Sequence, residues 1–378
     1  MRLIPILATT SAFVLIAGCA MDLRIKTTDG VKETRVRAVQ ADIDRMVGLG
    51  AAGAIATITE DGATVTLTSG VADRDSKTKI PTAPQQRVRA GSITKTFTSV
   101  VLLQLVSEGK VSLDEPVETY LPGLLRGDGI DGHAITVRQL MRHQSGLPDF
   151  AANPEVNEYL AGVEKRTATP AEEVAIALRR PADFAPGSRY AYSNTNYIVV
   201  GMLIERVTGK PFGDELQRRV ITPLGLQDTY LPATGELDIR GPHPEGYATI
   251  AGTVTDVSRV EPSVPWAAGS IVSTGVDLNR FYAAVVAGQV VKARELEQML
   301  AGVPTGPDPG LTYGLGIGST TLPCGAEYIG HTGGIYGFFT ISGVTRDKRA
   351  VTLTFTKETT EKPDVSGMLS HALCPQPT

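Results

Sequence analysis

The strongest constraint on the fold is the position of the β-like segments, which occur near both ends of the chain and flank a mostly helical middle. Ala51–Asp61 and Thr64–Val71 alternate apolar and polar residues about Asp61-Gly62, a pattern that predicts a hairpin. Short β-like runs return after Thr312, at Tyr313–Ile317, Gly337–Val344 and Ala350–Thr356. We expect strands from both ends to complete one antiparallel sheet, in an α+β fold with helices flanking the sheet.

The segments between these strands predict helices. Ile93–Val106 is apolar nearly all round and is followed by Gly109, which indicates a buried core helix with a glycine after its end. Ala283–Gln298 and Val365–Leu373 predict two more helices. Residues 113–226 mix short helical stretches with Pro and Gly turns, and we expect a helical subdomain there, over one edge of the sheet.

Length and charge exclude some classes of protein. The 378 residues allow one large domain, and we expect it to span residues 38–378. The net charge of −4 argues against a nucleic-acid partner, which would normally select a basic surface. The charge by itself suggests no other partner, and the oligomeric state is left open.

The start of the chain is typical of an exported protein. Arg2 precedes an apolar stretch that ends in small residues, so residues 1–18 are predicted to be a signal peptide. Ile16-Ala17-Gly18-Cys19 is similar to the bacterial lipobox, which predicts lipid attachment at Cys19 and a tether over residues 19–37. This would anchor the protein to the outer side of a membrane in the cell envelope. A plain signal peptide or a short uncleaved anchor is the alternative.

Two further cysteines, Cys324 and Cys374, become disulfide candidates if the chain is exported to an oxidising compartment. They have no His neighbours at ligand spacing, so they form a poor zinc site. The alternative is a pair of reduced, buried thiols. The five histidines are scattered along the chain, and we expect neither a metal nor a cofactor.

The chemistry-bearing motif that remains is S-x-x-K, which places a serine and a lysine one helical turn apart on one face. A serine hydroxyl needs a base nearby, and a lysine can serve if its pKa is lowered. The motif occurs at Ser76/Lys79, Ser92/Lys95 and Ser107/Lys110. Of these, Ser92 alone begins a helix, where the dipole favours a developing oxyanion. The alternative is an ordinary N-cap serine.

Two later motifs complete a pattern. Tyr192-Ser193-Asn194 and His331-Thr332-Gly333 follow Ser92/Lys95 in the order expected of penicillin-interacting serine enzymes. With these motifs and the segment His143–Leu147, the chain resembles the class C β-lactamase-like serine hydrolases. Within that family it is most similar to exported D-alanyl-D-alanine carboxypeptidases. The resemblance covers roughly residues 51–374 and implies a β-lactamase/transpeptidase-like fold.

The resemblance also implies roles for individual residues. Ser92 would form an acyl-enzyme, and Lys95 and Tyr192 would pass its proton to the leaving group. The resemblance leaves open which of these two residues is the base. His331 stands where the family usually has a catalytic-site lysine. The implied substrate contacts are Asn194, Thr332, Gly333 and Gly334, with the backbone N–H groups of Ser92 and Gly334 as the oxyanion hole. Cys324 and Cys374 fall where the carboxypeptidase branch has its disulfide.

Departures from the family pattern concern the substrate. The carboxypeptidase branch has an arginine that binds the terminal carboxylate, whereas this chain has Ile317-Gly318-Ser319. It also has Gly334 in place of a threonine, and its single tryptophan, Trp266, is spaced differently from the substrate-lining tryptophan of the family. We expect a D-alanyl-D-alanine carboxypeptidase that acts on peptidoglycan-like peptides and is acylated by β-lactams. A β-lactamase, a D-amino-acid peptidase, an esterase or a penicillin-sensing binding module are the alternatives.

Overall fold

The computed structural model describes residues 30–306, 310–357, 359 and 363–375. The predicted signal peptide, Cys19 and residues 20–29 of the predicted tether lie outside these residues. Within them, no helix is long and apolar enough to cross a membrane.

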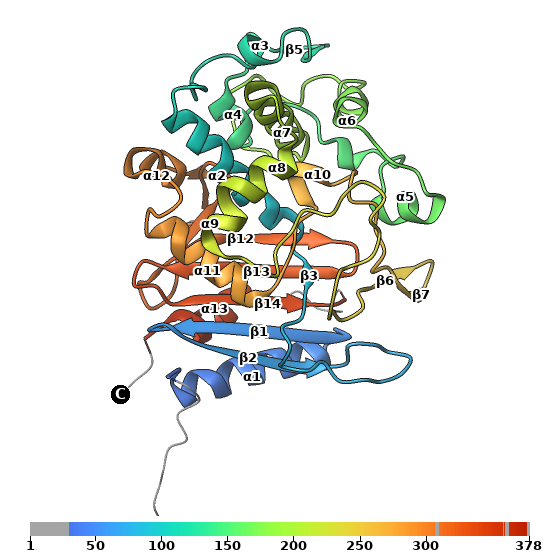
Figure 1. The fold of residues 1–378 in the computed structure, drawn as a ribbon, viewed down its shortest axis with the longest axis vertical. Coiled ribbons are helices and arrows are strands. Elements are labelled where there is room, and N and C mark those ends of the chain that lie inside the picture. The colour runs from blue at the N-terminus through green and yellow to red at the C-terminus, as the bar shows by residue number, and fades with distance from the viewer. Residues whose placement is uncertain (1–29, 307–309, 358, 360–362, 376–378) are drawn as a thin grey trace, which may run out of the picture.

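An eight-stranded antiparallel sheet forms the base of the molecule (Figure 1). Its order is β2-β1-β14-β13-β12-β11-β10-β9, so the N-terminal hairpin pairs with the last strand of the chain, as predicted. The strands are β1 Gly53–Glu60, β2 Ala63–Gly70, β9 Val303–Pro304, β10 Thr312–Tyr313, β11 Gly318–Thr321, β12 Glu327–Ile335, β13 Phe338–Thr345 and β14 Ala350–Phe355. The expectation of an α+β fold with an antiparallel sheet is confirmed.

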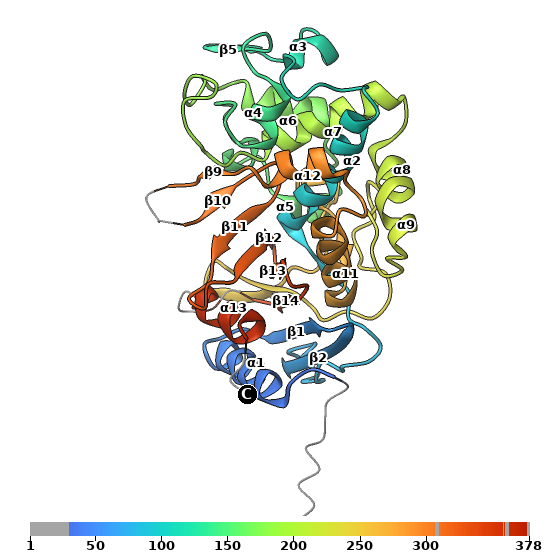
Figure 2. The same cartoon turned by 90° about the vertical axis from the view of Figure 1, so that its left-hand side faces the viewer.

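Helices cover both faces of this sheet (Figure 2). α1 (Glu33–Gly48) and α13 (Val365–Leu373) pack on one face, against the alternate apolar side chains of β1 and β14. α11 (Gly275–Val286) packs on the opposite face, where Asn279 hydrogen-bonds Thr352 of β14. Because successive side chains of a strand point to opposite faces, the sheet contributes to two separate hydrophobic cores, one on each face.

The predicted core helix is α2, Thr94–Ser107, which lies between the sheet and the helical region (Figure 1). Its all-round apolar surface is explained by packing against four other helices, α7, α8, α10 and α12. The remaining helices are α3 Val117–Tyr120, α4 Val137–Met141, α5 Glu158–Glu164, α6 Pro170–Ala177, α7 Thr195–Thr208, α8 Phe212–Leu216, α9 Thr222–Leu224, α10 Trp266–Gly269 and α12 Ala293–Leu300. α3 to α9 fall within the predicted helical region 113–226.

Three short antiparallel pairs lie outside the main sheet. β3 pairs with β8 and leads into the turn before α2, whereas β6 and β7 form a hairpin beside the end of the sheet. These strands are β3 Val88–Arg89, β8 Val272–Ser273, β4 Arg126–Gly127, β5 Ile130–Asp131, β6 Tyr247–Ile250 and β7 Thr253–Asp256.

Three sequence expectations are wrong. Ala283–Gln298 is not one helix: α11 ends at Val286 and α12 begins at Ala293, because Gly288 takes a positive φ of 69° between them. Of the predicted strand 313–317, only Tyr313 lies in a strand, β10, and residues 314–317 form a turn, since Gly316 has φ 76°. The folded domain begins before residue 38, because α1 starts at Glu33 and Arg35 is fully buried.

Candidate active site

The nucleophile candidate Ser92 lies on a 3₁₀ turn, Gly91–Ile93, that runs directly into α2. Gly91 has φ +54°, and a Cβ there would lie 2.9 Å from the backbone nitrogen of Gly334. A Cβ on Gly333 would lie 1.9 Å from the carbonyl oxygen of Ala90. Glycines on both sides therefore let the Gly91–Ile93 turn, which we call the serine turn, pack directly on β12. This packing brings the backbone N–H groups of Ser92 and Gly334 close together.

Lys95 lies one turn along α2 and is fully buried. Its Nζ contacts three acceptors: Ser92 Oγ at 3.1 Å, Asn194 Oδ1 at 2.7 Å and the carbonyl oxygen of Ala268 at 2.8 Å. Burial lowers the pKa of Lys95 to about 7, against the opposing effect of the Asp149 carboxylate. Near neutral pH the amine therefore exists in both protonation states, as a group that exchanges a proton with Ser92 must.

Tyr192 presents its ring to the same lysine, with Lys95 Nζ 4.9 Å from the ring centroid. The side chain is 37% exposed overall. Burial raises the pKa of Tyr192 further above its ordinary value of 10, and interaction with the Ser92 side chain opposes this rise only in part. The phenol is thus neutral at physiological pH and can pass on a proton, whereas a phenolate base is disfavoured.

Asn194 is fixed by Asp149, a residue that the sequence analysis did not identify. Asp149 accepts hydrogen bonds from the backbone nitrogen of Asn194 at 3.1 Å and from its Nδ2 at 3.0 Å. This orients Oδ1 of Asn194 toward Lys95. Burial raises the pKa of Asp149, although these hydrogen bonds oppose the rise. The sequence signal for Asp149 is its position two residues after the Ser145-Gly146-Leu147 segment, but only the fold brings it to Asn194.

His331 is buried in β12. Its Nε2 contacts the hydroxyl of Tyr313 at 2.9 Å, and its Nδ1 contacts the carbonyl oxygen of Thr332. Burial lowers the pKa of His331 to about 3, and the charge of Lys95 acts in the same direction. The imidazole is therefore neutral and supplies no positive charge to a substrate. Thr332 points the opposite way and is exposed, as alternation along the strand requires.

His143 is a second residue whose importance the sequence analysis did not recognise. Its Nδ1 accepts from the backbone nitrogen of Ser193 at 3.2 Å and from Asn196 Nδ2 at 3.1 Å. Its ring centroid is 4.3 Å from that of Tyr192. Burial lowers its pKa well below the ordinary value of 6.5, so the ring is neutral. His143 thus fixes the strand-like segment that carries both Tyr192 and Asn194.

A cleft of about 310 Å³ opens in front of the serine, and Ser92, Asn194 and Gly334 line it. The other lining residues are mostly apolar or aromatic, with Asn157 and Glu158 as the polar exceptions: Phe150, Ala151, Val156, Asn157, Glu158, Val264, Pro265, Ala268, Gly269, Ile335 and Tyr336. Trp266 does not line it and packs edge-on against Phe212 instead. Among the described residues, no cluster of His, Cys, Asp or Glu could hold a metal ion.

A serine at a helix start, a buried lysine with a lowered pKa and a neutral tyrosine are together the groups expected in the active site of a serine hydrolase. The Beta-lactamase family model matches residues 39–372. The chain belongs to this family, and the resemblance seen in the sequence is confirmed.

Similarity to individual proteins supports the same assignment. The structure superposes on a D-stereospecific amidohydrolase from Streptomyces sp. with a TM-score of 0.83 and 36% identity, covering 89% of this chain and 98% of that one. A D-aminopeptidase from Brucella anthropi is 32% identical over 46% of this chain and 32% of its own length. Penicillin-binding protein 4 from Amycolatopsis lactamdurans is 28% identical over 61% of this chain and 58% of its own length. The chain spans between 30% and 61% of the length of the curated relatives it matches.

Proposed function

We propose that this protein hydrolyses the amide bond that follows a D-configured amino acid with a free α-amino group. The observation that carries the proposal is the charge of the cleft: none of the described residues that line it is Lys or Arg, whereas one is Glu158. A carboxylate there favours a substrate ammonium, and nothing in the lining favours a carboxylate. The D configuration is suggested by similarity to a D-stereospecific amidohydrolase and a D-aminopeptidase.

In this proposal Lys95 is the base. Its neutral form accepts the proton of Ser92 Oγ across 3.1 Å while Oγ attacks the substrate carbonyl. The carbonyl oxygen becomes an oxyanion between the N–H groups of Ser92 and Gly334. The proton then passes through the Tyr192 hydroxyl to the leaving nitrogen, and the C–N bond breaks to give an acyl-enzyme. Water hydrolyses this ester and restores the serine.

D-Alanyl-D-alanine carboxypeptidase activity is the second candidate. Exposed Thr332, two residues before Gly334 on β12, supports it, because a hydroxyl there could hydrogen-bond a terminal carboxylate. Against it, His331 is neutral and buried, and a hydroxyl alone lacks the charge that makes such contacts strong. Acylation by β-lactams would accompany either activity, and either substrate would be a small peptide or amide.

We also propose that the protein is exported and held at the membrane by a lipid on Cys19. The disulfide between Cys324 and Cys374 supports an oxidising compartment, since such bonds are rare in the cytosol. Metabolic labelling with a lipid precursor, with Cys19→Ala as the control, tests the anchor.

The deciding experiment compares D-phenylalanine amide, L-phenylalanine amide and an N-acylated D-Ala-D-Ala peptide. We expect turnover of the D-amide alone, and none with Ser92→Ala. Glu158→Gln should raise KM for the D-amide by about tenfold or more, because a charged hydrogen bond is worth roughly 1.5–3 kcal/mol. Glu155→Gln is the matched control, since Glu155 is exposed and lies outside the cleft lining. Release of D-Ala from the peptide without hydrolysis of the amide would reject the proposal in favour of the carboxypeptidase.

A further inference from the structure

The amine of Lys95 lies over two tyrosine rings, those of Tyr192 and of Tyr197 on α7. We propose that Tyr197 is a positioning residue for the catalytic lysine: its ring, together with that of Tyr192, encloses the amine and stabilises its charged form. The inference deepens the proposed function and rests on it in one respect, which is that Lys95 is the base.

The contacts of the Lys95 amine are of two kinds. Three oxygen acceptors lie within 3.1 Å of Nζ, so each N–H of an ammonium has a partner. The tyrosine rings supply the second kind, because Nζ lies 4.9 Å from the ring centroid of Tyr192 and 5.6 Å from that of Tyr197. Both distances are within the roughly 6 Å over which a ring face attracts a cation. Lys95 is fully buried, so water does not weaken this attraction.

Hydrogen bonds fix the ring of Tyr197 in this place. The side chain is fully buried, and its hydroxyl donates to the carbonyl oxygen of Met141 at 2.9 Å. The same hydroxyl lies 3.0 Å from Ser99 Oγ. Ser99 follows Lys95 by four residues and so lies on the same face of α2. The tyrosine is therefore tied to the helix that carries the lysine.

The turn at Gly316 holds Tyr197 from another direction. Gly316 has φ 76°, and a Cβ there would lie 2.6 Å from the Tyr197 hydroxyl oxygen and 2.9 Å from the backbone carbonyl oxygen of Lys95. The carbonyl oxygen of Gly316 accepts a hydrogen bond from Thr96 Oγ1 at 2.7 Å. A glycine at this position thus lets the turn pack on α2 and on the tyrosine at once.

The charge of Lys95 depends on the titratable groups that face it. These groups come from the serine turn, the segment after α4, the turn before Phe150, the Tyr192 segment, α7 and β12: Ser92, His143, Asp149, Tyr192, Tyr197 and His331. Burial lowers the pKa values of both histidines and raises those of both tyrosines, so these four groups are neutral near pH 7. The Asp149 carboxylate favours the ammonium, and the ring faces act in the same direction. Loss of a ring should therefore make the lysine a weaker base.

The charge distribution of the ring separates this role from packing. Tyr197→Phe keeps the ring and loses the hydroxyl. Pentafluorophenylalanine in place of Tyr197 has nearly the shape of phenylalanine, but fluorine reverses the negative potential of the ring face that attracts a cation. The readout is the pH dependence of kcat/KM for a neutral p-nitrophenyl ester, with urea unfolding to establish that each variant is folded.

A second pair of variants removes a ring altogether. Tyr197→Leu removes the proposed contact with Lys95. Tyr282→Leu is the matched control, because Tyr282 on α11 is equally buried and its hydroxyl contacts α2 at Thr96 Oγ1, 3.2 Å away, rather than at Lys95. If Tyr197→Leu does not fold, the comparison of phenylalanine with pentafluorophenylalanine decides alone.

We expect Tyr197→Phe to keep the wild-type midpoint near pH 7 to within about 0.3 unit, whereas pentafluorophenylalanine should lower it by about one unit. Tyr197→Leu should lower the midpoint similarly, and Tyr282→Leu should leave it unchanged. Equal midpoints for the two ring variants, or equal shifts for the two leucine variants, would overturn the inference.

The same data distinguish this inference from the proposed function. A wild type with no midpoint near pH 7 would show that Lys95 is not the base, and the inference would then be wrong. The expected ester profiles without turnover of any D-amino-acid amide would reject the proposed function and leave the role of Tyr197 standing.

Discussion

Burial determines the acid–base roles of the two candidate bases, Lys95 and Tyr192. Both are surrounded by protein where they meet Ser92, but desolvation acts in opposite directions on an ammonium and on a phenol. It lowers the pKa of Lys95 to about 7 and raises that of Tyr192 above 10. The sequence identifies both residues but leaves the base open, because the pKa of each depends on contacts from segments distant along the chain, such as Ala268 and Asp149.

A pH profile tests this assignment. Because Lys95 must be neutral to accept the Ser92 proton, kcat/KM should increase as pH rises through about 7 and then level off. A neutral p-nitrophenyl ester is the appropriate substrate, since it does not titrate in this range. Lys95→Arg should lose roughly 10²–10⁴-fold in rate at every pH, because arginine stays charged.

Tyr192→Phe is the matching variant. It should lower the rate and keep the midpoint near pH 7. If the midpoint disappears in Tyr192→Phe, tyrosine rather than lysine is the titrating base.

Glu173 on α6 is a buried acid that the proposed mechanism does not use. It is 1% exposed, and neither carboxyl oxygen has a hydrogen-bond partner. Burial raises its pKa from 4.5 to about 10, with a smaller contribution from Glu172. The folded state therefore binds one more proton than the unfolded state between these pH values, so stability falls as pH rises from about 4.5 to about 10.

Glu173→Gln should remove that loss, which amounts to at most roughly 1.4 kcal/mol per pH unit. Urea unfolding at pH 6 and pH 9 measures it. The variant should be more stable than wild type at pH 9, and the difference should shrink at pH 6. An unchanged pH dependence would show that Glu173 does not titrate in this range.

At the scale of secondary-structure elements, the sequence predicted the features that depend on local patterns and missed those that depend on tertiary contacts. The hairpin β1–β2 and the helix α2 follow from alternation and from a long apolar run, which are local signals. The break between α11 and α12 was missed because apolar residues continue across Gly288. Asp149 and His143 were missed as site residues because only packing of α7 against α4 and the Phe150–Ala152 turn brings them to Asn194 and Tyr192.

The contact between β12 and the serine turn gives a prediction about two adjacent glycines. Gly333→Ala should push β12 away from Ser92, because the new Cβ would lie 1.9 Å from Ala90 O and 3.2 Å from Ser92 N. We expect a loss of order 10²–10³ in kcat, the usual effect of losing an oxyanion-hole donor. Gly334→Ala is the matched control: it meets no atom within 4 Å and keeps its N–H. Equal activities of the two variants would contradict this account of β12.

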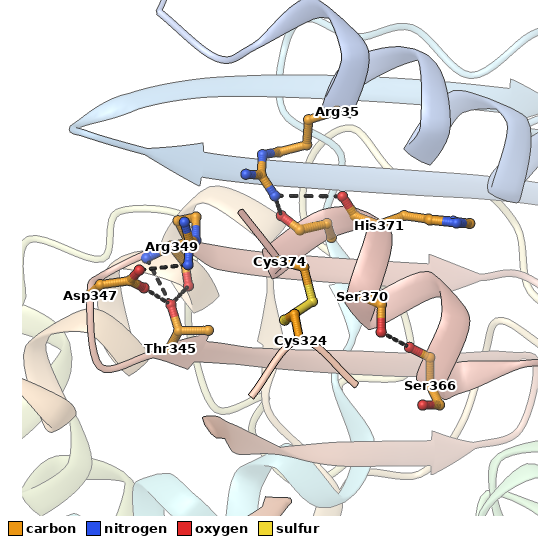
Figure 3. The surroundings of a disulfide bond; sticks show 10 residues. Arg35, Cys324, Thr345, Asp347, Arg349, Ser366, Ser370, His371 and Cys374 are labelled. Atoms are coloured by element: carbon orange, nitrogen blue, oxygen red, sulfur yellow. Dashed lines mark hydrogen bonds and ion pairs between the residues drawn. A yellow bond between two sulfur atoms is a disulfide. The ribbon is translucent and has the colours of Figure 1, made fainter. Parts of the chain in front are cut away.

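At the scale of the whole molecule, a disulfide bond fastens the C-terminal helix α13 to the sheet. Cys324, between β11 and β12, is bonded to Cys374 at the end of α13, with sulfurs 2.02 Å apart (Figure 3). The bond closes a loop of 50 residues. The double variant Cys324→Ser/Cys374→Ser should therefore lose about 4 kcal/mol of unfolding free energy, in the chain-entropy estimate.

Urea titrations with and without reductant measure this loss. The double variant should be insensitive to reductant and should keep its turnover at 25 °C, since the bond lies outside the cleft lining. A wild-type protein that is equally stable in reductant would contradict the prediction.

α1 is attached to β1 and to α13 through Arg35. Its guanidinium donates to both carboxylate oxygens of Glu60 on β1, each at 3.1 Å. It also donates to the backbone carbonyl oxygen of Ala372 on α13 and to that of the neighbouring His371 (Figure 3). We expected Arg35 to lie in a polar tether, because a charged residue in a polar segment gives no local sign of burial. The ion pair instead makes the N-terminal helix part of the folded domain.

Shortened chains test where the domain begins. A chain without residues 1–29 should match the stability of the intact chain, whereas one without residues 1–37 should lose roughly 3–5 kcal/mol, because Glu60 would be left as a buried, unpaired charge. Thermal unfolding of both chains measures the difference, with Arg37→Ala as a control from the exposed side of the same helical turn. Arg35→Met in the longer chain should reproduce most of the loss. If both shortened chains unfold at the same temperature, the first turn of α1 with Arg35 contributes nothing to the stability of the domain, and the boundary near residue 38 is restored.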